Sequence, residues 1–202
     1  MSVAMKKKRN QEDTRAKLLD AALDIFSKNG YDAATTRNIA KKAGVNESLI
    51  HRYFKSKLGL FLALRQHFRA NLTKQFLSYE ASENLEEELV RFMKSRLQGT
   101  KREKKFLKLA ISQAILNPKV REDVQKYANL KPPALVERFD KLRRIGQIRM
   151  DADLDQIIDI LHLVGFSFSC LIDIIECMPK EGSEKMIRTA VKLLSEGLRP
   201  RL

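Results

Sequence analysis

Apolar side chains recur every three or four residues along most of the chain, which is the spacing of amphipathic helices. The pattern predicts a helix over residues 12–29, two short helices over 37–42 and 47–53, and a long helix over 57–78. Residues 1–10 lack this pattern and are polar and basic, so we expect a disordered arm there. The apolar positions of the first helix are Leu18, Leu19, Ala22, Leu23 and Phe26.

The remainder of the chain keeps the helical spacing. Further helices are expected over residues 83–99, 102–117, 119–130, 133–146, 151–178 and 183–198. Prolines separate several of these segments, because proline breaks or kinks a helix. No strand-like alternation is evident, so the predicted fold class is all-α, with a three-helix N-terminal head and a larger C-terminal helical part.

The segment 153–177 is apolar on nearly all sides, and such a helix needs cover on both sides. One side can pack on its own subunit and the other on a partner. Asp159, His162 and Asp173 interrupt the segment, so we interpret it as a buried helix rather than a membrane span. Its apolar positions are Ile157, Ile158, Ile160, Leu161, Leu163, Val164, Phe166, Phe168, Leu171, Ile172 and Ile175.

Composition adds a soluble character and a strong positive charge. The chain is 44% hydrophobic and 32% charged, with a net charge of +14. Residues 1–57 hold 13 basic against 6 acidic residues, a net +7. Such a charge favours a polyanionic partner, either nucleic acid or an anionic membrane surface, although a well-solvated basic surface explains the charge equally well. Cys170 and Cys177 are too few for a disulfide framework, and no signal peptide is evident, so we expect reduced thiols in the cytoplasm.

The segment 36–54 meets the physical demands of a helix-turn-helix. Two short helices that cross closely need a small residue at the contact, which Ala40 supplies, and the turn between them needs a glycine, which Gly44 supplies. Polar residues follow on the outer face of the second helix, the face that enters a DNA major groove. An ordinary helical hairpin is the alternative. The inward-pointing apolar positions are Ile39, Ala43, Val45 and Ile50.

The stretch "TRAKLLDAALDIFSKNGYDAATTRNIAKKAGVNESLIHRYFKSKLGLF" resembles the N-terminal pattern of the TetR (tetracycline-repressor-like) family of transcriptional regulators over about residues 14–68. The resemblance implies a cytoplasmic homodimer with a DNA-binding domain over 11–56 and a ligand-binding and dimerisation domain over 57–202. Residues 153–198 would form the dimer interface as a four-helix bundle. A small apolar or amphipathic effector would release the protein from its operator, so the implied regulator is a repressor.

Candidate DNA contacts fall into two groups. Thr36 at a helix N-terminus and Arg37 beside it are expected at phosphates, and the resemblance adds Tyr53 and Lys57. Base reading is expected from Asn46, Glu47, Ser48, Leu49, His51 and Arg52. Glu47 has two interpretations, since it can accept from cytosine or merely favour the helix dipole. The basic arm with Lys6 and Arg9 is interpreted either as a minor-groove contact or as a solubilising tail.

Candidates in the C-terminal part rest mainly on the resemblance. The family places its pocket where Phe92, Ile111, Phe139 and Phe166 would line an apolar cavity, and plain core packing is the alternative for each. His162 is interpreted as a satisfied core or interface histidine.

Three kinds of chemistry have no support in the sequence. No Cys/His spacing suggests a metal site, no cofactor motif is present, and no nucleophile or phosphate loop indicates an enzyme. The alternative function is a non-specific basic protein that binds nucleic acid or an anionic membrane surface and has no effector.

Overall fold

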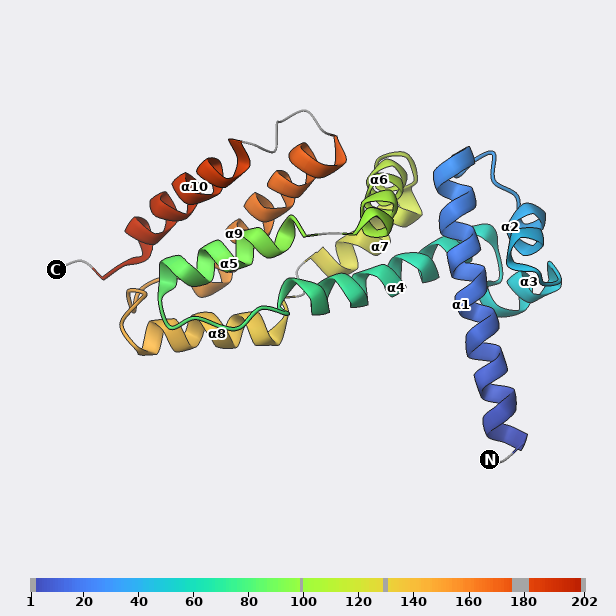
Figure 1. Ribbon diagram of the computed structural model, residues 1–202, viewed down its shortest axis with the longest axis horizontal. Coiled ribbons are helices and arrows are strands. Elements are labelled where there is room, and N and C mark those ends of the chain that lie inside the picture. Colours follow the sequence, from blue (N-terminus) through green and yellow to red (C-terminus); the bar gives the residue numbers. More distant parts are fainter. Residues whose placement is uncertain (1–2, 99, 129–130, 176–181, 201–202) are drawn as a thin grey trace. The chain divides into compact units, whose positions relative to one another are not determined.

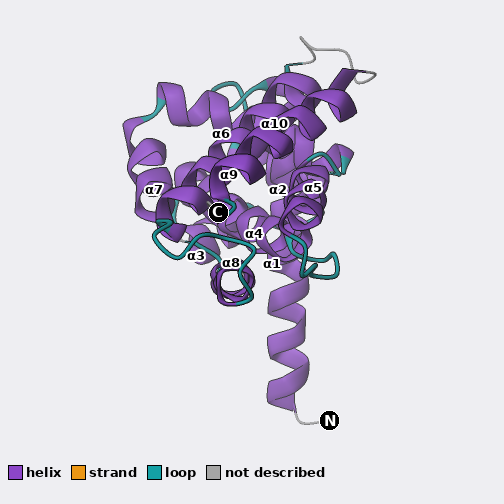
Figure 2. Ribbon diagram, turned by 90° about the vertical axis from the view of Figure 1, so that its left-hand side faces the viewer, coloured by secondary structure: helices purple, strands orange, loops and turns teal. Residues whose placement is uncertain are grey.

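The computed structural model of the chain describes residues 3–98, 100–128, 131–175 and 182–200. Every regular element within these residues is a helix (Figures 1 and 2), which confirms the all-α prediction. The first half holds α1 (Val3–Asn29), α2 (Thr36–Ala43), α3 (Ser48–Phe54), α4 (Lys57–Phe76) and α5 (Leu85–Arg96). The second half holds α6 (Lys101–Leu116), α7 (Pro118–Ala128), α8 (Pro133–Arg144), α9 (Leu154–Phe168), the π-helix η1 (Ser169–Ile174) and α10 (Ser183–Leu198).

Helix α1 begins earlier than the sequence pattern indicated. It starts at Val3 rather than near residue 12, so residues 3–10 are helical and not the disordered arm that we expected. Ala, Met, Lys and Arg have high helix propensity, and this segment contains neither glycine nor proline. The helix therefore extends outward from its packed part without a residue that would stop it. Its other end is stopped by Gly30, which has a φ of 78°.

The chain divides into two compact units. Unit 1 comprises Met1–Ala70 and Lys105–Ala128, and unit 2 comprises Asn71–Lys104 and Asn129–Leu202. The division differs from the boundary expected between residues 56 and 57. Most of α4, most of α6 and all of α7 belong with α1, α2 and α3, because their apolar side chains share one core cluster.

Two contacts tie α4 to α6 and α7 within unit 1. The ring of Phe68 stacks on that of Phe106, with 4.4 Å between the centroids. Arg65 donates from Nε to the Asp123 carboxylate at 2.6 Å and from Nη2 to the Asp123 carbonyl at 2.8 Å. Both side chains of this ion pair are mostly buried. Neither contact is visible in the sequence pattern, which explains why the sequence alone indicated a different division.

Unit 2 forms around the inward faces of α5, α8, α9 and α10. Helix α5 packs against α9 and α10, and α8 packs against α9, as Figure 1 shows for α5, α9 and α10. Gly165 lets α9 approach α5 closely, because a Cβ there would lie 2.9 Å from Cγ of Arg96. The fully buried side chains of this core include Leu89, Phe92, Phe139, Leu161 and Val191.

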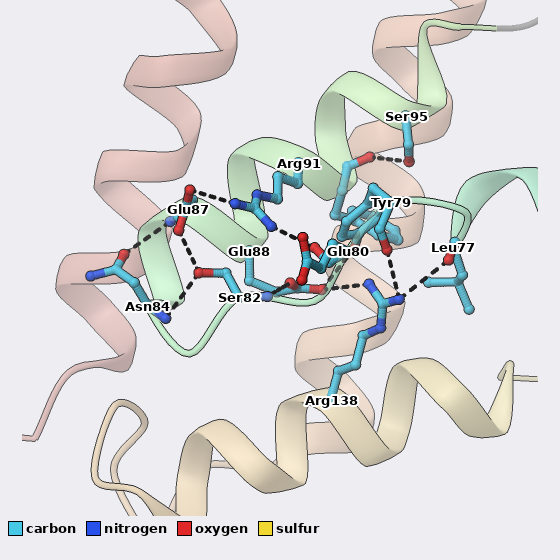
Figure 3. Close-up of polar contacts among 11 residues, drawn as sticks. Leu77, Tyr79, Glu80, Ser82, Asn84, Glu87, Glu88, Arg91, Ser95 and Arg138 are labelled. Carbon is cyan, nitrogen blue, oxygen red and sulfur yellow. Dashed lines mark hydrogen bonds and ion pairs between the residues drawn. The ribbon is translucent and has the colours of Figure 1, made fainter.

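A buried carboxylate fastens the segment between α4 and α5 to α8 (Figure 3). Glu88 has no exposed surface, and its Oε1 accepts from the Tyr79 hydroxyl at 2.8 Å and from Arg138 Nη1 at 3.2 Å. Its Oε2 accepts from the backbone N–H of Ser82 at 2.8 Å. Arg138 also donates to the carbonyls of Leu77 and Tyr79, at 3.2 and 3.0 Å, and lies over the Tyr79 ring. Burial, and then the Glu88 charge, raise the pKa of the Tyr79 phenol.

The outer side of α9 is apolar and uncovered in the single chain. The segment Leu154–Ile172 is long and apolar enough to cross a membrane by length and composition, yet only 22% of its apolar window is buried. The sequence indicated a buried helix, and the structure buries only the side that carries Ile158, Leu161 and Gly165. Asp155 and Asp159 on this segment each form an ion pair with Lys131.

Candidate nucleic-acid interface

Local hydrogen bonds define both ends of α2. Thr35 is the N-cap, and its hydroxyl accepts from the backbone N–H of Asn38 at 3.1 Å. Gly44 follows the last turn in the left-handed conformation, with φ 67° and ψ 33°, which a glycine adopts without strain. The next residue, Val45, donates to the Ala40 carbonyl at 3.1 Å. These contacts form the tight turn that the glycine predicted.

The apolar scaffold under the two short helices is closed. Ile39, Ala40 and Ile50 are buried as the sequence predicted, and Phe54 joins them at 5% exposure. The Phe54 ring also lies 5.4 Å from the Arg15 guanidinium of α1. The buried side chains of α3 therefore fix the helix on unit 1, and its outer side chains are not needed for this. This leaves the opposite side available to a partner.

The residues expected to read bases differ in solvent exposure. Asn46, Ser48, His51 and Arg52 are exposed. Leu49 is half-buried and packs against the unit 1 core, which reduces the part of it that can meet a base. Arg37, at the start of α2, is exposed as well.

Two of the polar residues also have intramolecular bonds. Asn46 accepts from the backbone N–H of Ser48 at 2.8 Å, which caps the start of α3. His51 Nδ1 lies 3.3 Å from the carbonyl oxygen of Lys55, a residue with a φ of 70°. Tyr53 is half-buried and its ring makes an edge contact with Phe54.

Thr36, expected at a phosphate, and Glu47, expected among the base-reading residues, contact each other. The Thr36 hydroxyl donates to Glu47 Oε1 at 2.5 Å, across the turn from the start of α2 to the start of α3. Both side chains are half-buried. Glu47 makes no capping bond with α3, so its carboxylate serves the N-terminus of α2 instead. Neither of the two interpretations drawn from the sequence described this contact.

Lys57 has a different role from the backbone contact that the resemblance implied. Its Nζ donates to the carbonyls of Tyr31, Asp32 and Ala34, at 3.0, 3.1 and 3.0 Å. It also lies 4.6 Å from the centroid of the Tyr31 ring. An ammonium has three N–H donors, and all three are used here. The side chain therefore fastens α4 to the turn after α1, and no N–H remains for a phosphate in this conformation.

The four candidate pocket residues differ in burial and come from both units. Phe92 and Phe139 are fully buried in the unit 2 core, whereas Phe166 is 40% exposed. Ile111 belongs to unit 1 and is half-buried.

His162 lies beside Phe92, with 5.8 Å between the stacked ring centroids. Burial, and then the Arg96 charge, lower the pKa of His162. Burial also lowers the pKa of the Arg96 guanidinium, to about 10. In the residues that the structure describes, no group of three or more His, Cys, Asp or Glu side chains is placed to hold a metal ion. Cys170 is a free, half-buried thiol, and Cys177 lies outside the described residues.

The residues that organise the polar interior of unit 2 were not predicted from the sequence. Glu88 lies between Leu85 and Leu89 on the same helical side as Phe92, so an acid on an apolar stripe was the available signal. Its partner Arg138 had no comparable signal, because arginine on a helix is ordinarily exposed. The role of Lys57 was hidden for the same reason.

Comparisons with known proteins find bacterial transcriptional regulators. The family model described as "Bacterial regulatory proteins, tetR family" matches residues 18–64, which include α2 and α3. YvkB of Bacillus subtilis, an uncharacterized HTH-type transcriptional regulator, is 26% identical over 189 residues, which are 92% of this chain and 97% of YvkB. The HTH-type transcriptional repressor KstR of Mycolicibacterium smegmatis is 42% identical over 53 residues, which are 26% of each chain.

Solved structures share the fold over nearly the whole length. A TetR-family transcriptional regulator from Rhodococcus sp. matches with a TM-score of 0.75 at 14% identity, over 91% of this chain and 99% of that one. FadR of Bacillus subtilis, solved in complex with stearoyl-CoA, matches with a TM-score of 0.66 at 18% identity, over 91% and 99%. The names of these relatives describe regulators and indicate no enzymatic activity. Residues 18–64 therefore carry the DNA-binding region of the tetR family of bacterial regulatory proteins, and the chain is a DNA-binding transcriptional regulator.

Proposed function

We propose that the protein is a cytoplasmic homodimeric repressor that binds a specific operator and leaves it when a small molecule binds. The observation that carries the proposal is the polar outer edge of α2 and α3 over a closed apolar scaffold. A helix of this kind can enter a major groove with its polar edge toward the bases, while its buried edge keeps it in place. Among the relatives that match the head region, KstR is a repressor and FasR of Mycolicibacterium smegmatis is an activator, so repression is part of the proposal.

The proposed DNA contacts follow from exposure. Arg37, with Thr36 and the half-buried Tyr53, meets phosphates and sets the register. Asn46, Ser48, His51 and Arg52 meet base edges, with Leu49 contributing the exposed part of its side chain. Lys57 is left out of the direct contacts, because its three donors are bonded within the chain.

The dimer contact is proposed for the outer sides of α9 and α10, within the expected range 153–198. Large apolar side chains are exposed there, and a groove of about 550 Å³ runs between them, lined by Phe168, Met186, Ala190 and Leu193 among others. Exposed apolar surface of this extent is typical of a protein interface. A symmetric pairing would cover the same surface on both copies.

The effector is proposed to be a small apolar or amphipathic molecule that binds in unit 2. Phe92 and Phe139 supply an apolar interior, and His162 with Arg96 adds polar groups beside Phe92. FadR of Bacillus subtilis holds stearoyl-CoA in a similar fold, and a regulator from Saccharomonospora viridis was solved in complex with choline. Phe166 and Ile111 are weaker candidates, because one is largely exposed and the other belongs to unit 1.

A binding measurement tests the proposal. A duplex is first enriched from a random-sequence library with the wild-type protein, and its affinity is compared with that of a scrambled duplex. We expect Arg37→Ala with Tyr53→Ala to weaken binding to the enriched duplex at least tenfold, because two phosphate contacts are lost. Lys119→Ala on α7 removes an equal exposed charge and should change little. Equal affinity for the enriched and scrambled duplexes would instead support the non-specific basic protein.

The effector part is tested separately. Acyl-CoA thioesters, free fatty acids and choline are titrated into the complex with the enriched duplex, and release is followed by fluorescence anisotropy. We expect at least one class to release the DNA, and Phe92→Ala to weaken its effect. A protein that stays bound in the presence of every class would contradict the proposed effector while leaving DNA binding intact.

A further inference from the structure

The Thr36–Glu47 hydrogen bond places a negative charge where a DNA phosphate is expected. Thr36 is the first residue of α2, and a helix N-terminus attracts anions through its free N–H groups and its dipole. The first turn of α2 carries no acidic residue of its own. The carboxylate comes instead from Glu47, eleven residues later, and its Oε1 accepts a hydrogen bond from the Thr36 hydroxyl at 2.5 Å.

We propose that Glu47 occupies the phosphate site of α2 in the free protein and yields it to the DNA backbone on binding. The inference rests on the proposed contact between Thr36 and a phosphate. Two anions cannot share one hydroxyl donor, because like charges at contact distance repel. The phosphate therefore displaces the carboxylate from Thr36, and the freed carboxylate lies at the start of α3 among the reading residues Asn46 and Ser48.

The displaced carboxylate makes Glu47 a specificity-determining residue. A carboxylate can accept from the N4 amino group of cytosine in the major groove, and it is repelled wherever only acceptors or phosphates face it. A duplex that presents a cytosine amino group to Glu47 compensates for the lost bond to Thr36, and a duplex without one does not. Glu47 thus lowers affinity for non-specific DNA, which raises discrimination through an unfavourable contact rather than an additional favourable one.

The sequence setting supports a role beyond helix capping. Asn46 already caps α3 by accepting from Ser48, so α3 does not require Glu47. Thr35 already accepts from Asn38, so α2 has its own N-cap as well. Both helices are therefore capped without the Glu47 carboxylate, and its charge at this place is available for another function.

The test compares Glu47→Gln with Glu122→Gln, an identical change at an exposed residue of α7 in the same unit. Affinities are measured for the enriched duplex and for a scrambled duplex over a range of salt concentrations. We expect Glu47→Gln to raise affinity for the scrambled duplex about tenfold and to reduce the ratio of specific to non-specific affinity by a similar factor. Glu122→Gln should change both affinities less than about twofold.

A purely structural hydrogen bond would give a different result. In that case Glu47→Gln would lower both affinities in the same proportion, or leave both unchanged, and either outcome overturns the proposal. Thr36→Val provides the second variant, since it removes the hydroxyl and keeps the charge. We expect Glu47→Gln to raise non-specific affinity in the Thr36→Val background too, because the charge still faces the phosphate. No effect in that background would contradict the inference.

The proposed function can fail independently. If the wild-type protein enriches no sequence, sequence-specific binding is wrong, and the scrambled duplex still compares Glu47→Gln with Glu122→Gln. If only Glu47→Gln binds the scrambled duplex more tightly than the wild type, the proposal that Glu47 repels a phosphate at α2 still stands.

Discussion

The head and the C-terminal unit expose opposite kinds of surface. Between residues 12 and 56, all of which are described, no large apolar side chain is exposed. On α9, η1 and α10 the exposed apolar side chains include Ile160, Leu163, Phe166 and Leu193. Unit 2 also has a charged group in its interior, because the Glu88 carboxylate is completely buried there. The head is thus complete within one chain, whereas unit 2 leaves an apolar surface that a second copy can cover.

The largest expected effect lies in the buried polar network of unit 2. Glu88→Ala removes the acceptor of the Tyr79 hydroxyl, the Ser82 N–H and Arg138. Breaking one side of a buried ion pair costs about 3–5 kcal/mol, so we expect the free energy of unfolding to fall by that order. Urea denaturation at fixed protein concentration measures the change.

A neighbouring acid is the control for this prediction. Glu87 is exposed and bonds to Ser82 Oγ and Arg91 at the surface, so Glu87→Ala should leave the urea midpoint almost unchanged. Replacing Glu88 and Arg138 together by Leu and Met should recover much of the loss, because no unpaired charge then remains. Equal midpoints for Glu87→Ala and Glu88→Ala would show that the Glu88 network contributes nothing.

The next effect concerns the uncovered apolar surface itself. Leu163 is 66% exposed on α9, so Leu163→Asp should not disturb the fold of one chain. In a dimer it would bury an unpaired carboxylate, and we expect the dissociation constant to rise about 100-fold. Sedimentation at micromolar concentration measures the change.

Met150 provides the matched control. Its side chain is 74% exposed in the loop before α9, outside the proposed interface. We expect Met150→Asp to sediment as the wild type does. A wild-type protein that sediments as a monomer would contradict the argument that a second copy covers the apolar surface of unit 2.

Particular residues show how much of this could be predicted. Gly44 and Ala40 indicated the helix-turn-helix, because few residues satisfy a positive φ or a close helix contact. The periodicity likewise indicated an all-α fold. The Thr36–Glu47 contact, the three bonds of Lys57 and the Arg65–Asp123 pair could not be predicted, since each depends on side chains brought together by tertiary packing. A polar residue has no periodic signature that identifies its partner.

A smaller effect compares the two units through equivalent caps. Thr35 accepts from Asn38 at the start of α2, and Asn84 accepts from Glu87 at the start of α5. Each substitution to Ala should lower the free energy of unfolding by about 1 kcal/mol. Only Thr35→Ala should also weaken operator binding, because α2 carries the proposed phosphate contacts. Operator affinities that fall equally in both variants would mean that the head does not bind DNA independently of α5.

The smallest expected effect is the pH dependence from His162. Burial, and then the Arg96 charge, hold its folded pKa below the ordinary value of about 6.5. The unfolded chain therefore binds the proton more readily, and the free energy of unfolding falls as the pH drops from about 6.5 toward the folded pKa. His162→Gln should reduce this slope in urea denaturation between about pH 5 and 7.5. His67→Gln, at an exposed histidine of α4, should keep the wild-type slope, and a slope that follows His67 instead would place the pH sensitivity in unit 1 rather than in unit 2.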